Sequence, residues 1–217
     1  MSCHEDVQAT GTIRPHPWNL GRSCTFTHAN TMNHWSALRT DIARTYKYAR
    51  GGKLRRVIEC IRAPGVQTMV VFRYGQWARS MPLVLRLVLD PIYLVLNTYI
   101  QVVWGIELPR NATVGPGLYI GHFGGITISA ATVIGAHCNI SQNITIGVAG
   151  KGDKRGVPSI GDYVYIAPGA RLFGKITIGN NVKIGANAVI HKSIPDNAVA
   201  VLDPGFKIID AAPNTRD

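Results

Sequence analysis

Residues 160–195 read IGDYVY-IAPGAR-LFGKIT-IGNNVK-IGANAV-IHKSIP, six units of six residues that each begin with an aliphatic side chain. A period of six fits neither the 3.6-residue period of an α-helix nor the two-residue alternation of a plain strand. It is typical of a solenoid with three short strands in each coil, where one coil takes eighteen residues. Each aliphatic residue should therefore stack on the one eighteen positions later, as Ile160 on Ile178 and Leu172 on Ile190.

The same period continues towards the N-terminus, and many of its aliphatic positions are followed by a small residue, which suits the corner between two strands. The register slips twice. Two extra residues lie between Ile126 and Ile134, and fourteen residues separate Ile146 from Ile160. A solenoid places insertions in loops, often on its binding face. We therefore expect a glycine-rich, basic loop at residues 147–159.

The stretches YIGHFGGITIS and GKGDKRGVPSIGDYVYIAPGARLFGKITIGNNVKIGANAVI resemble the hexapeptide-repeat acyltransferases, and among them the serine O-acetyltransferase group, especially members associated with exopolysaccharide or capsule synthesis. The resemblance covers residues 106–206. It implies a mainly β fold, a left-handed parallel β-helix preceded by an α-helical N-terminal region. It also implies acetyl-CoA as the donor, a hydroxyl group as the acceptor, and active sites between neighbouring subunits of a trimer.

Four segments follow from these patterns. Residues 1–31 are polar and without periodicity, so we expect them to be disordered. Residues 32–105 should be helical, basic at first and then apolar, and should serve in oligomerisation or at a membrane surface. Residues 106–206 should form the acyltransferase β-helix, and residues 207–217 a C-terminal tail. The helical segment could build either a homotrimer or a dimer of trimers.

His122 is the candidate general base. Acyl transfer to an alcohol needs a base because a free hydroxyl is barely ionised at neutral pH, and the ordinary pKa of histidine suits that task. The glycines on either side of His122 would let a substrate approach the backbone. The resemblance places Glu107 as the acidic partner that orients the imidazole. A structural corner histidine and a surface carboxylate are the alternatives for these two residues.

The resemblance also assigns the donor site. It places the pantetheine arm of acetyl-CoA along small residues in a groove between subunits, and two lysines are candidates for the nucleotide phosphates. The predicted donor contacts are Ala167, Pro168, Gly185, Ala186, Lys183 and Lys192.

Three departures from the serine-specific members bear on the acceptor. Gly121 stands where they carry aspartate, Arg155 and Gly156 stand where their extended loop carries a second histidine, and residues 214–217 lack their terminal isoleucine. These absences favour a neutral acceptor, and we expect Gly121, Asn143 and Arg155 to contact it. The sequence thus predicts an O-acetyltransferase acting on a sugar hydroxyl of a polysaccharide or its precursor. Serine acetylation in cysteine biosynthesis is the alternative, and a non-catalytic scaffold is a third reading.

No metal site is expected. The zinc hydratases of this architecture need three converging histidines, whereas His122, His137 and His191 are fifteen and fifty-four residues apart. The four cysteines are scattered without a CxxC pair, which favours free thiols in a reducing compartment. The N-terminus shows no signal-peptide pattern. We expect a cytoplasmic protein.

The net charge of +11 is concentrated, because residues 39–62 contain eight basic and two acidic side chains. This indicates either a solvated helix face or attraction to an anionic membrane surface, whereas nucleic-acid binding rests on charge alone and is not expected. Residues 81–106 are strongly apolar. Arg86 and Asp90 should pair there, and Pro91 should break the run into pieces too short to span a bilayer. We therefore expect helices that pack on each other, on a partner subunit or at the inner face of the membrane. A membrane span or a re-entrant hairpin is the alternative.

Overall fold

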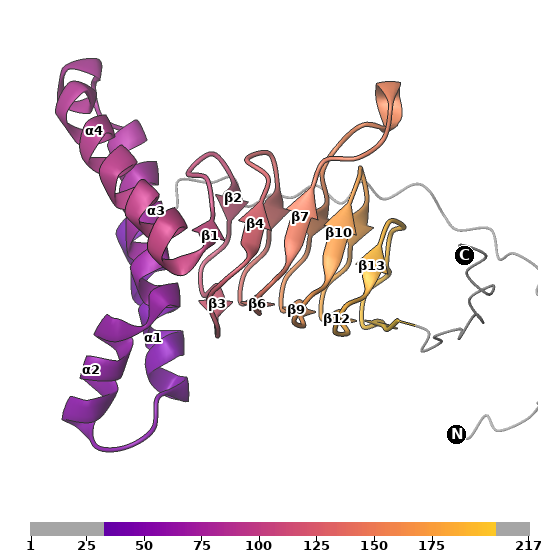
Figure 1. Ribbon diagram of the computed structural model, residues 1–217, viewed down its shortest axis with the longest axis horizontal. Helices are drawn as coiled ribbons and strands as arrows, with labels where there is room; N and C mark the ends of the chain where they lie inside the picture. The colour runs from indigo at the N-terminus through magenta and orange to yellow at the C-terminus, as the bar shows by residue number, and fades with distance from the viewer. Residues whose placement is uncertain (1–32, 203–217) are drawn as a thin grey trace, which may run out of the picture. The chain divides into compact units, whose positions relative to one another are not determined.

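The computed structural model describes residues 33–202 of the 217-residue chain. A helical segment comes first and a coil of parallel strands follows it (Figure 1). The predictions for residues 1–31 and 207–217 lie outside the described residues. The remaining two segments meet at Gly105, whose φ of +62° is the left-handed conformation that glycine adopts readily.

The helical segment has an inner and an outer layer. Helices α1 and α3 contact strand β3 of the first coil, whereas α2 packs on α1 and α3, and α4 packs on α3 (Figure 1). The side chain of Asn33 starts α1 by accepting a hydrogen bond from the Trp35 N–H at 3.0 Å, and Pro64 is the first residue of α3. The helices are α1 (His34–Tyr48), α2 (Lys53–Arg62), α3 (Pro64–Arg79) and α4 (Leu83–Tyr99), and α4 continues as a π-helix, η1 (Ile100–Trp104).

Three parallel sheets form the sides of the coil, and successive strands of the chain pass from sheet A to sheet B to sheet C. Sheet A contains β1 (Ile106–Glu107), β4 (Ile126–Ile128), β7 (Thr145–Gly147), β10 (Arg171–Phe173) and β13 (Val189–Ile190). Sheet B contains β2 (Thr113–Val114), β5 (Val133–Ile134), β8 (Ser159–Ile160) and β11 (Thr177–Ile178). Sheet C contains β3 (Tyr119–Ile120), β6 (Asn139–Ile140), β9 (Tyr165–Ile166), β12 (Lys183–Ile184) and β14 (Val199–Ala200).

The interior of the coil is a set of aliphatic stacks. Ile160 pairs with Ile178 and Leu172 with Ile190, as the eighteen-residue spacing predicts. Ile160, Leu172 and Ile178 are fully buried. Burial of each such side chain stabilises the fold by about 1.5–3 kcal/mol. The predicted fold class, a left-handed parallel β-helix preceded by helices, is confirmed.

The first register slip is absorbed inside sheet A. Ile126 and Ile128 of β4 both point inward with Thr127 outward between them, and Ile128 pairs with Ile146 of β7. Ile144, just before β7, is buried as well. Two extra residues thus extend one strand by a full inward–outward period, which leaves the direction of every later side chain unchanged.

The second slip is a loop between β7 and β8. Ala149 and Gly156 exchange backbone hydrogen bonds of 3.1 and 3.0 Å across it, and a short 3₁₀ helix, η2 (Gly152–Lys154), forms its tip. Gly150 at φ +94° makes the turn out of the coil. We call residues 148–158 the β7–β8 loop. It leaves the corner between sheets A and B.

The prediction that Pro91 breaks the apolar run is wrong, because α4 runs through it. The expected Arg86–Asp90 pair is present at 3.5 Å, and Asp90 also pairs with Arg110 at 2.6 Å. The Tyr93 ring packs against Gly75 of α3, where a Cβ atom would collide with it. Contacts on both sides of Pro91 therefore hold the helix in place and offset the backbone hydrogen bond that proline removes.

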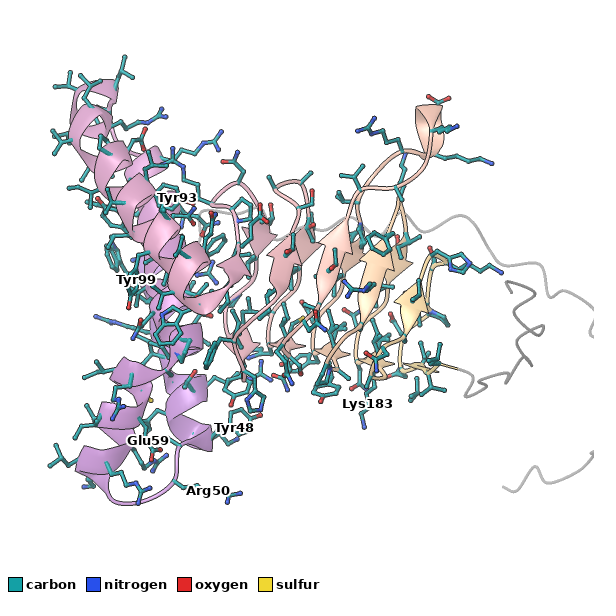
Figure 2. All side chains as sticks on the ribbon, in the orientation of Figure 1. Tyr48, Arg50, Glu59, Tyr93, Tyr99 and Lys183 are labelled. Atoms are coloured by element: carbon teal, nitrogen blue, oxygen red, sulfur yellow. The ribbon has the colours of Figure 1, made fainter. Side chains whose placement is uncertain are left out.

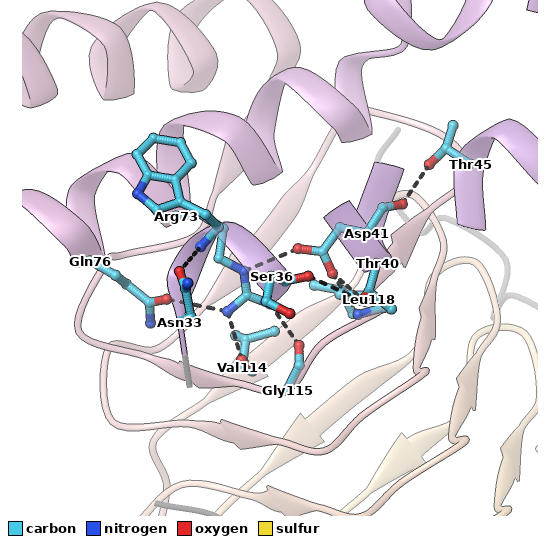
Figure 3. Close-up of polar contacts among 12 residues, drawn as sticks. Asn33, Ser36, Thr40, Asp41, Thr45, Arg73, Gln76, Val114, Gly115 and Leu118 are labelled. Atoms are coloured by element: carbon cyan, nitrogen blue, oxygen red, sulfur yellow. Dashed lines mark hydrogen bonds and ion pairs between the residues drawn. The ribbon is translucent and has the colours of Figure 1, made fainter. Parts of the chain in front are cut away.

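A buried ion pair joins the helices to the first coil (Figure 3). The Arg73 Nε of α3 donates to the Asp41 carboxylate of α1 at 3.0 Å. The two Nη groups of Arg73 donate to the carbonyl oxygens of Val114 and Gly115 at 2.8 and 2.7 Å. The guanidinium therefore satisfies backbone acceptors at the end of the coil, where no earlier strand can reach them.

Asp41 performs the matching role for backbone donors. Its Oδ1 accepts the N–H groups of Gly117 and Leu118 at 2.6 and 3.0 Å. Burial raises the pKa of this carboxyl, and Arg73 together with the two N–H groups acts in the opposite direction. The helical segment thus closes the first coil with one side chain for its free acceptors and another for its free donors.

Candidate active site

One corner of the coil brings together most of the predicted site residues. This corner, which we call the C–A corner, consists of the residues that follow each sheet C strand and precede the next sheet A strand. His122, Asn143, Pro168 and Ala186 lie on it in four successive coils. Ala167 and Gly185 flank the last two. The repeat thus places residues that are 64 positions apart along one edge.

Backbone hydrogen bonds tie this edge together from coil to coil. The Asn143 N–H donates to the Gly124 carbonyl at 2.8 Å, Gly169 donates to Gln142 at 3.1 Å, and Asn187 donates to Pro168 at 2.9 Å. Neighbouring coils lie one strand spacing apart, so the three steps from His122 to Ala186 cover about 14 Å. That length suits an extended chain lying along the edge.

The imidazole of His122 lies beside main chain that is accessible from solvent. Its side chain is exposed, and Gly124 and Gly125 adopt φ values of +95° and +66° directly after it. A Cβ atom at Gly124 would meet nothing within 4 Å. A second molecule can therefore approach the main chain here without a collision.

An aromatic contact missed by the sequence analysis supports the His122 segment. The rings of Phe123 and Trp104 meet edge to face at 5.1 Å, and the Gly124 N–H donates to the Trp104 carbonyl at 2.9 Å. The Trp104 indole N–H in turn donates to the Gln67 side chain of α3 at 3.0 Å. The only signal in the sequence was a tryptophan at the end of the apolar run.

Glu107 lies one coil before the His122 segment, on the outward side of β1. It is exposed and pairs in register with Thr127 of β4. Within residues 33–202, the carboxylate of Glu107 and the imidazole of His122 form neither a hydrogen bond nor an ion pair. The role of Glu107 as the orienting carboxylate stays a prediction.

The cationic candidates are divided between different parts of the coil. Lys183 projects outward from sheet C, on the strand that leads into the C–A corner (Figure 2). Arg155 lies in the β7–β8 loop, and Lys192 follows β13, so both sit where the chain leaves sheet A. A single chain therefore does not bring Arg155 or Lys192 together with His122. Arg171 of β10 is a further exposed cation beside the C–A corner, and it donates to Thr145 at 2.7 Å.

Two surface hollows among the described residues lie away from His122. One of about 490 Å³ is bordered by His34, Arg79 and Arg110, and another of about 430 Å³ lies under the β7–β8 loop against Phe173 and His191. Neither of these two hollows borders the C–A corner. Among residues 33–202, no group of three or more His, Cys, Asp or Glu side chains could hold a metal ion.

Sequence comparisons relate the repeat to bacterial transferases. The family described as "Bacterial transferase hexapeptide (six repeats)" matches residues 158–192. The serine acetyltransferase of Synechococcus elongatus is 31% identical over 144 residues, which are 65% of this chain and 56% of that protein. A serine acetyltransferase of Staphylococcus aureus is 42% identical over 101 residues, 46% of this chain and 47% of that protein. The chain thus spans about half the length of the curated relatives it matches.

Solved structures agree in fold. Serine acetyltransferase isoform 3 of Entamoeba histolytica, in complex with cysteine, is 29% identical with a TM-score of 0.65, over 82% of this chain and 61% of that one. The Brucella abortus serine acetyltransferase in complex with coenzyme A is 24% identical with a TM-score of 0.65, over 79% of this chain and 66% of that one.

These relatives correct the predicted acceptor. They are serine acetyltransferases, so the prediction of a polysaccharide-modifying enzyme is wrong, and no special closeness to exopolysaccharide or capsule enzymes is supported. That prediction rested on residues absent at three places, whereas the similarity rests on residues present over 101 to 144 positions. The expectation of an acetyl-CoA-dependent acyltransferase agrees with the relatives. In sequence and in fold, the chain resembles the hexapeptide-repeat acyltransferases of the serine acetyltransferase type.

Proposed function

We propose that this chain is an acetyltransferase that moves the acetyl group of acetyl-CoA to the hydroxyl of L-serine. The observation that carries the proposal is the C–A corner, where one edge aligns His122 with the small residues predicted to hold the donor. The similarity to serine acetyltransferases supports the choice of acceptor.

In the proposed reaction His122 accepts the proton of the serine hydroxyl while the oxygen attacks the thioester carbonyl carbon. A C–O bond forms, the C–S bond breaks, and the imidazolium returns its proton to the sulfur of coenzyme A. A histidine with a pKa near neutrality can serve as base and then as acid. Glu107 would stabilise the imidazolium if it turns towards the ring.

The donor lies along the C–A corner in this proposal. Ala186 is exposed and Pro168 and Gly185 are half-buried, so the pantetheine arm would contact these three residues, whereas Ala167 beside them is buried. The distance of about 14 Å along the edge fits that arm in an extended form. Lys183 projects outward from the adjoining strand (Figure 2), and in this proposal its ammonium group meets the phosphate groups of the donor.

A second subunit completes the site in this proposal. His122 stands on an open edge, whereas Arg155 and Lys192 lie where the chain leaves sheet A. In a homotrimer, the β7–β8 loop of one subunit can cover one side of the C–A corner of the next subunit. Arg155 would then meet the serine carboxylate, which a guanidinium binds with two hydrogen bonds. Asn143, one coil from His122, and the Gly121 backbone would line the same space.

The test is release of free coenzyme A from acetyl-CoA with L-serine, compared with a panel of free sugars. We expect turnover with L-serine, and an Arg155→Ala variant should raise the KM for serine more than it lowers kcat. An Arg171→Ala variant, which removes an exposed cation beside the C–A corner, is the control and should leave the KM for serine unchanged. Turnover of a sugar and none of L-serine would overturn the proposal.

A further inference from the structure

The outer helix α4 has its polar side turned inward. Arg86, Asp90, Tyr93 and Asn97 follow one another at helical spacing on the side that faces α3 and the first coil. Asp90 pairs there with Arg86 and Arg110, and the Tyr93 hydroxyl donates to the Asn97 side chain at 3.3 Å. A helix of a water-soluble protein normally shows the reverse arrangement, with its polar side in solvent.

The opposite side of α4 is apolar and exposed. The helix and its π-helical end form a run of 22 residues, and an 18-residue window of this run has a mean hydropathy of 1.6 and is only 11% buried. By length and composition alone, this run could cross a membrane. The exposed apolar side chains are those of Leu83, Val84, Leu85, Leu87, Val88, Ile92, Leu94, Val95, Leu96, Val102 and Val103.

Helix α2, in the same layer, repeats the arrangement at smaller scale. Leu54, Val57, Ile58 and Ile61 recur at the spacing of one helix face, and their exposures range from 45% to 75%. Cys60, on the other side, is buried. We call the exposed apolar side chains of α2 and α4 together the outer apolar face.

Exposed basic side chains border the α2 part of this face. They come from the end of α1, the connection to α2, and α2 itself, and Arg50 projects from that connection (Figure 2). Residues 34–104 contain eleven Lys and Arg against three Asp and Glu, a net charge of +8. The exposed basic residues near α2 are Lys47, Arg50, Lys53, Arg55 and Arg62.

We propose that the outer apolar face docks flat on an anionic lipid bilayer. Apolar residues beside a basic fringe are the combination that holds helices in the headgroup region, since the apolar part enters the acyl boundary while the cations meet lipid phosphates. The β-helix extends from the other side of α1 and α3, so docking leaves the C–A corner in water (Figure 1).

Two other occupants fit less well. A membrane-spanning α4 would take the Asp90 ion pairs and its contact with α3 into hydrocarbon, where charged groups are expensive. A second copy of the chain would bring the same fringe of exposed basic residues, Lys47, Arg50, Lys53, Arg55 and Arg62, against the first, and such charges repel. Anionic lipid is the partner whose charge is complementary.

The test is flotation of the full-length protein with vesicles. We expect binding to vesicles of phosphatidylcholine mixed with phosphatidylglycerol, little binding to phosphatidylcholine alone, and weaker binding as salt increases. Lys53→Glu/Arg62→Glu should reduce partitioning at least about tenfold, since each basic residue near an anionic surface strengthens binding about fivefold. The matched control, Lys151→Glu/Lys154→Glu in the β7–β8 loop, should bind as the unaltered protein does.

The apolar contribution is tested separately. Leu87→Ser/Leu94→Ser should reduce flotation, and Val199→Ser/Val201→Ser, which alters exposed valines of the last coil, should not. All four side chains are exposed, so unfolding temperatures should change little. Three results would overturn the proposal. The first is equal binding by test and control variants, and the second is resistance of the bound protein to alkaline carbonate extraction, which would indicate a membrane-spanning helix. The third is that the unaltered protein does not float with vesicles while Leu87→Ser/Leu94→Ser has a lower assembly mass, which would indicate that a second copy of the chain covers this face.

Discussion

The exposed imidazole of His122 is the residue on which the proposed chemistry depends. His122→Ala should lower kcat for acetyl transfer about 10²–10⁴-fold, which is the usual contribution of a positioned base. The KM for acetyl-CoA should change little, because the predicted donor residues lie two or three coils away. His191→Ala, another exposed histidine of the coil, is the control. Equal turnover by the His122 variant and the unaltered protein would remove this residue from the mechanism.

Cys138 illustrates the opposite environment, a titratable group sealed inside the coil. Burial raises the pKa of its thiol to about 11, and its Sγ lies 3.2 Å from the Gly161 carbonyl. Only the thiolate reacts with alkylating agents. At pH 8 about one Cys138 in a thousand is ionised, so iodoacetamide should leave Cys138 unmodified in the folded protein and modify it after denaturation. Mass spectrometry of the peptides reads this out, and rapid labelling at pH 8 would contradict the described burial.

The sequence predicts which coil of the solenoid a residue belongs to more readily than which corner of that coil it lies on. Four of the predicted residues share the C–A corner because the spacing from each to the next is close to one whole coil: His122, Asn143, Pro168 and Ala186. Lys192 was grouped with them on charge, yet it follows a sheet A strand and belongs to another corner. A shift of about six residues moves a side chain to the next face of the solenoid, so composition alone cannot assign a lysine to a site.

At the scale of elements, the joint between the helices and the first coil is the Asp41–Arg73 pair. Arg73→Met should lower the free energy of unfolding by about 3–5 kcal/mol, because it leaves a buried carboxylate without its cation. The control is Arg55→Met, since Arg55 pairs with Glu59 in solvent and such pairs contribute at most about 1 kcal/mol. Denaturant titration measures both. A combined Asp41→Asn/Arg73→Met variant should recover part of the loss.

The strands of the coil and the helical character of the apolar run were predictable, but the continuity of α4 through Pro91 was not. An aliphatic residue at every sixth position predicts both the strands and the corners between them, because this period is typical of a three-sided solenoid. Pro91 suggested an interruption in α4, but proline is a local signal and the packing of Tyr93 and Asp90 overrides it. Nor does an apolar run state which of its sides faces the protein. The outward direction of α4 depends on the few polar residues that find partners on α3 and the first coil.

At the scale of the whole molecule, the proposed site needs two subunits. Mixing His122→Ala chains with Arg155→Ala chains during refolding or co-expression should restore activity, although each variant alone is impaired. In a trimer of randomly mixed subunits, about a quarter of the sites would combine an intact His122 with an intact Arg155 of the neighbour. Serine acetylation assays on the mixed assemblies check this. Activity no higher than the average of the separate variants would place both residues in one chain.

The β7–β8 loop and the C–A corner lie at different corners of the same solenoid, and only the strands of the coil connect them. Residues can be inserted into or deleted from the β7–β8 loop while the row of residues on the C–A corner keeps its geometry. If the proposed function holds, substitutions within residues 148–158 would change which alcohol is accepted and leave His122 and the row of donor residues on the C–A corner unaltered. Such a division would let one ancestral scaffold diversify in substrate range without rebuilding its catalytic apparatus.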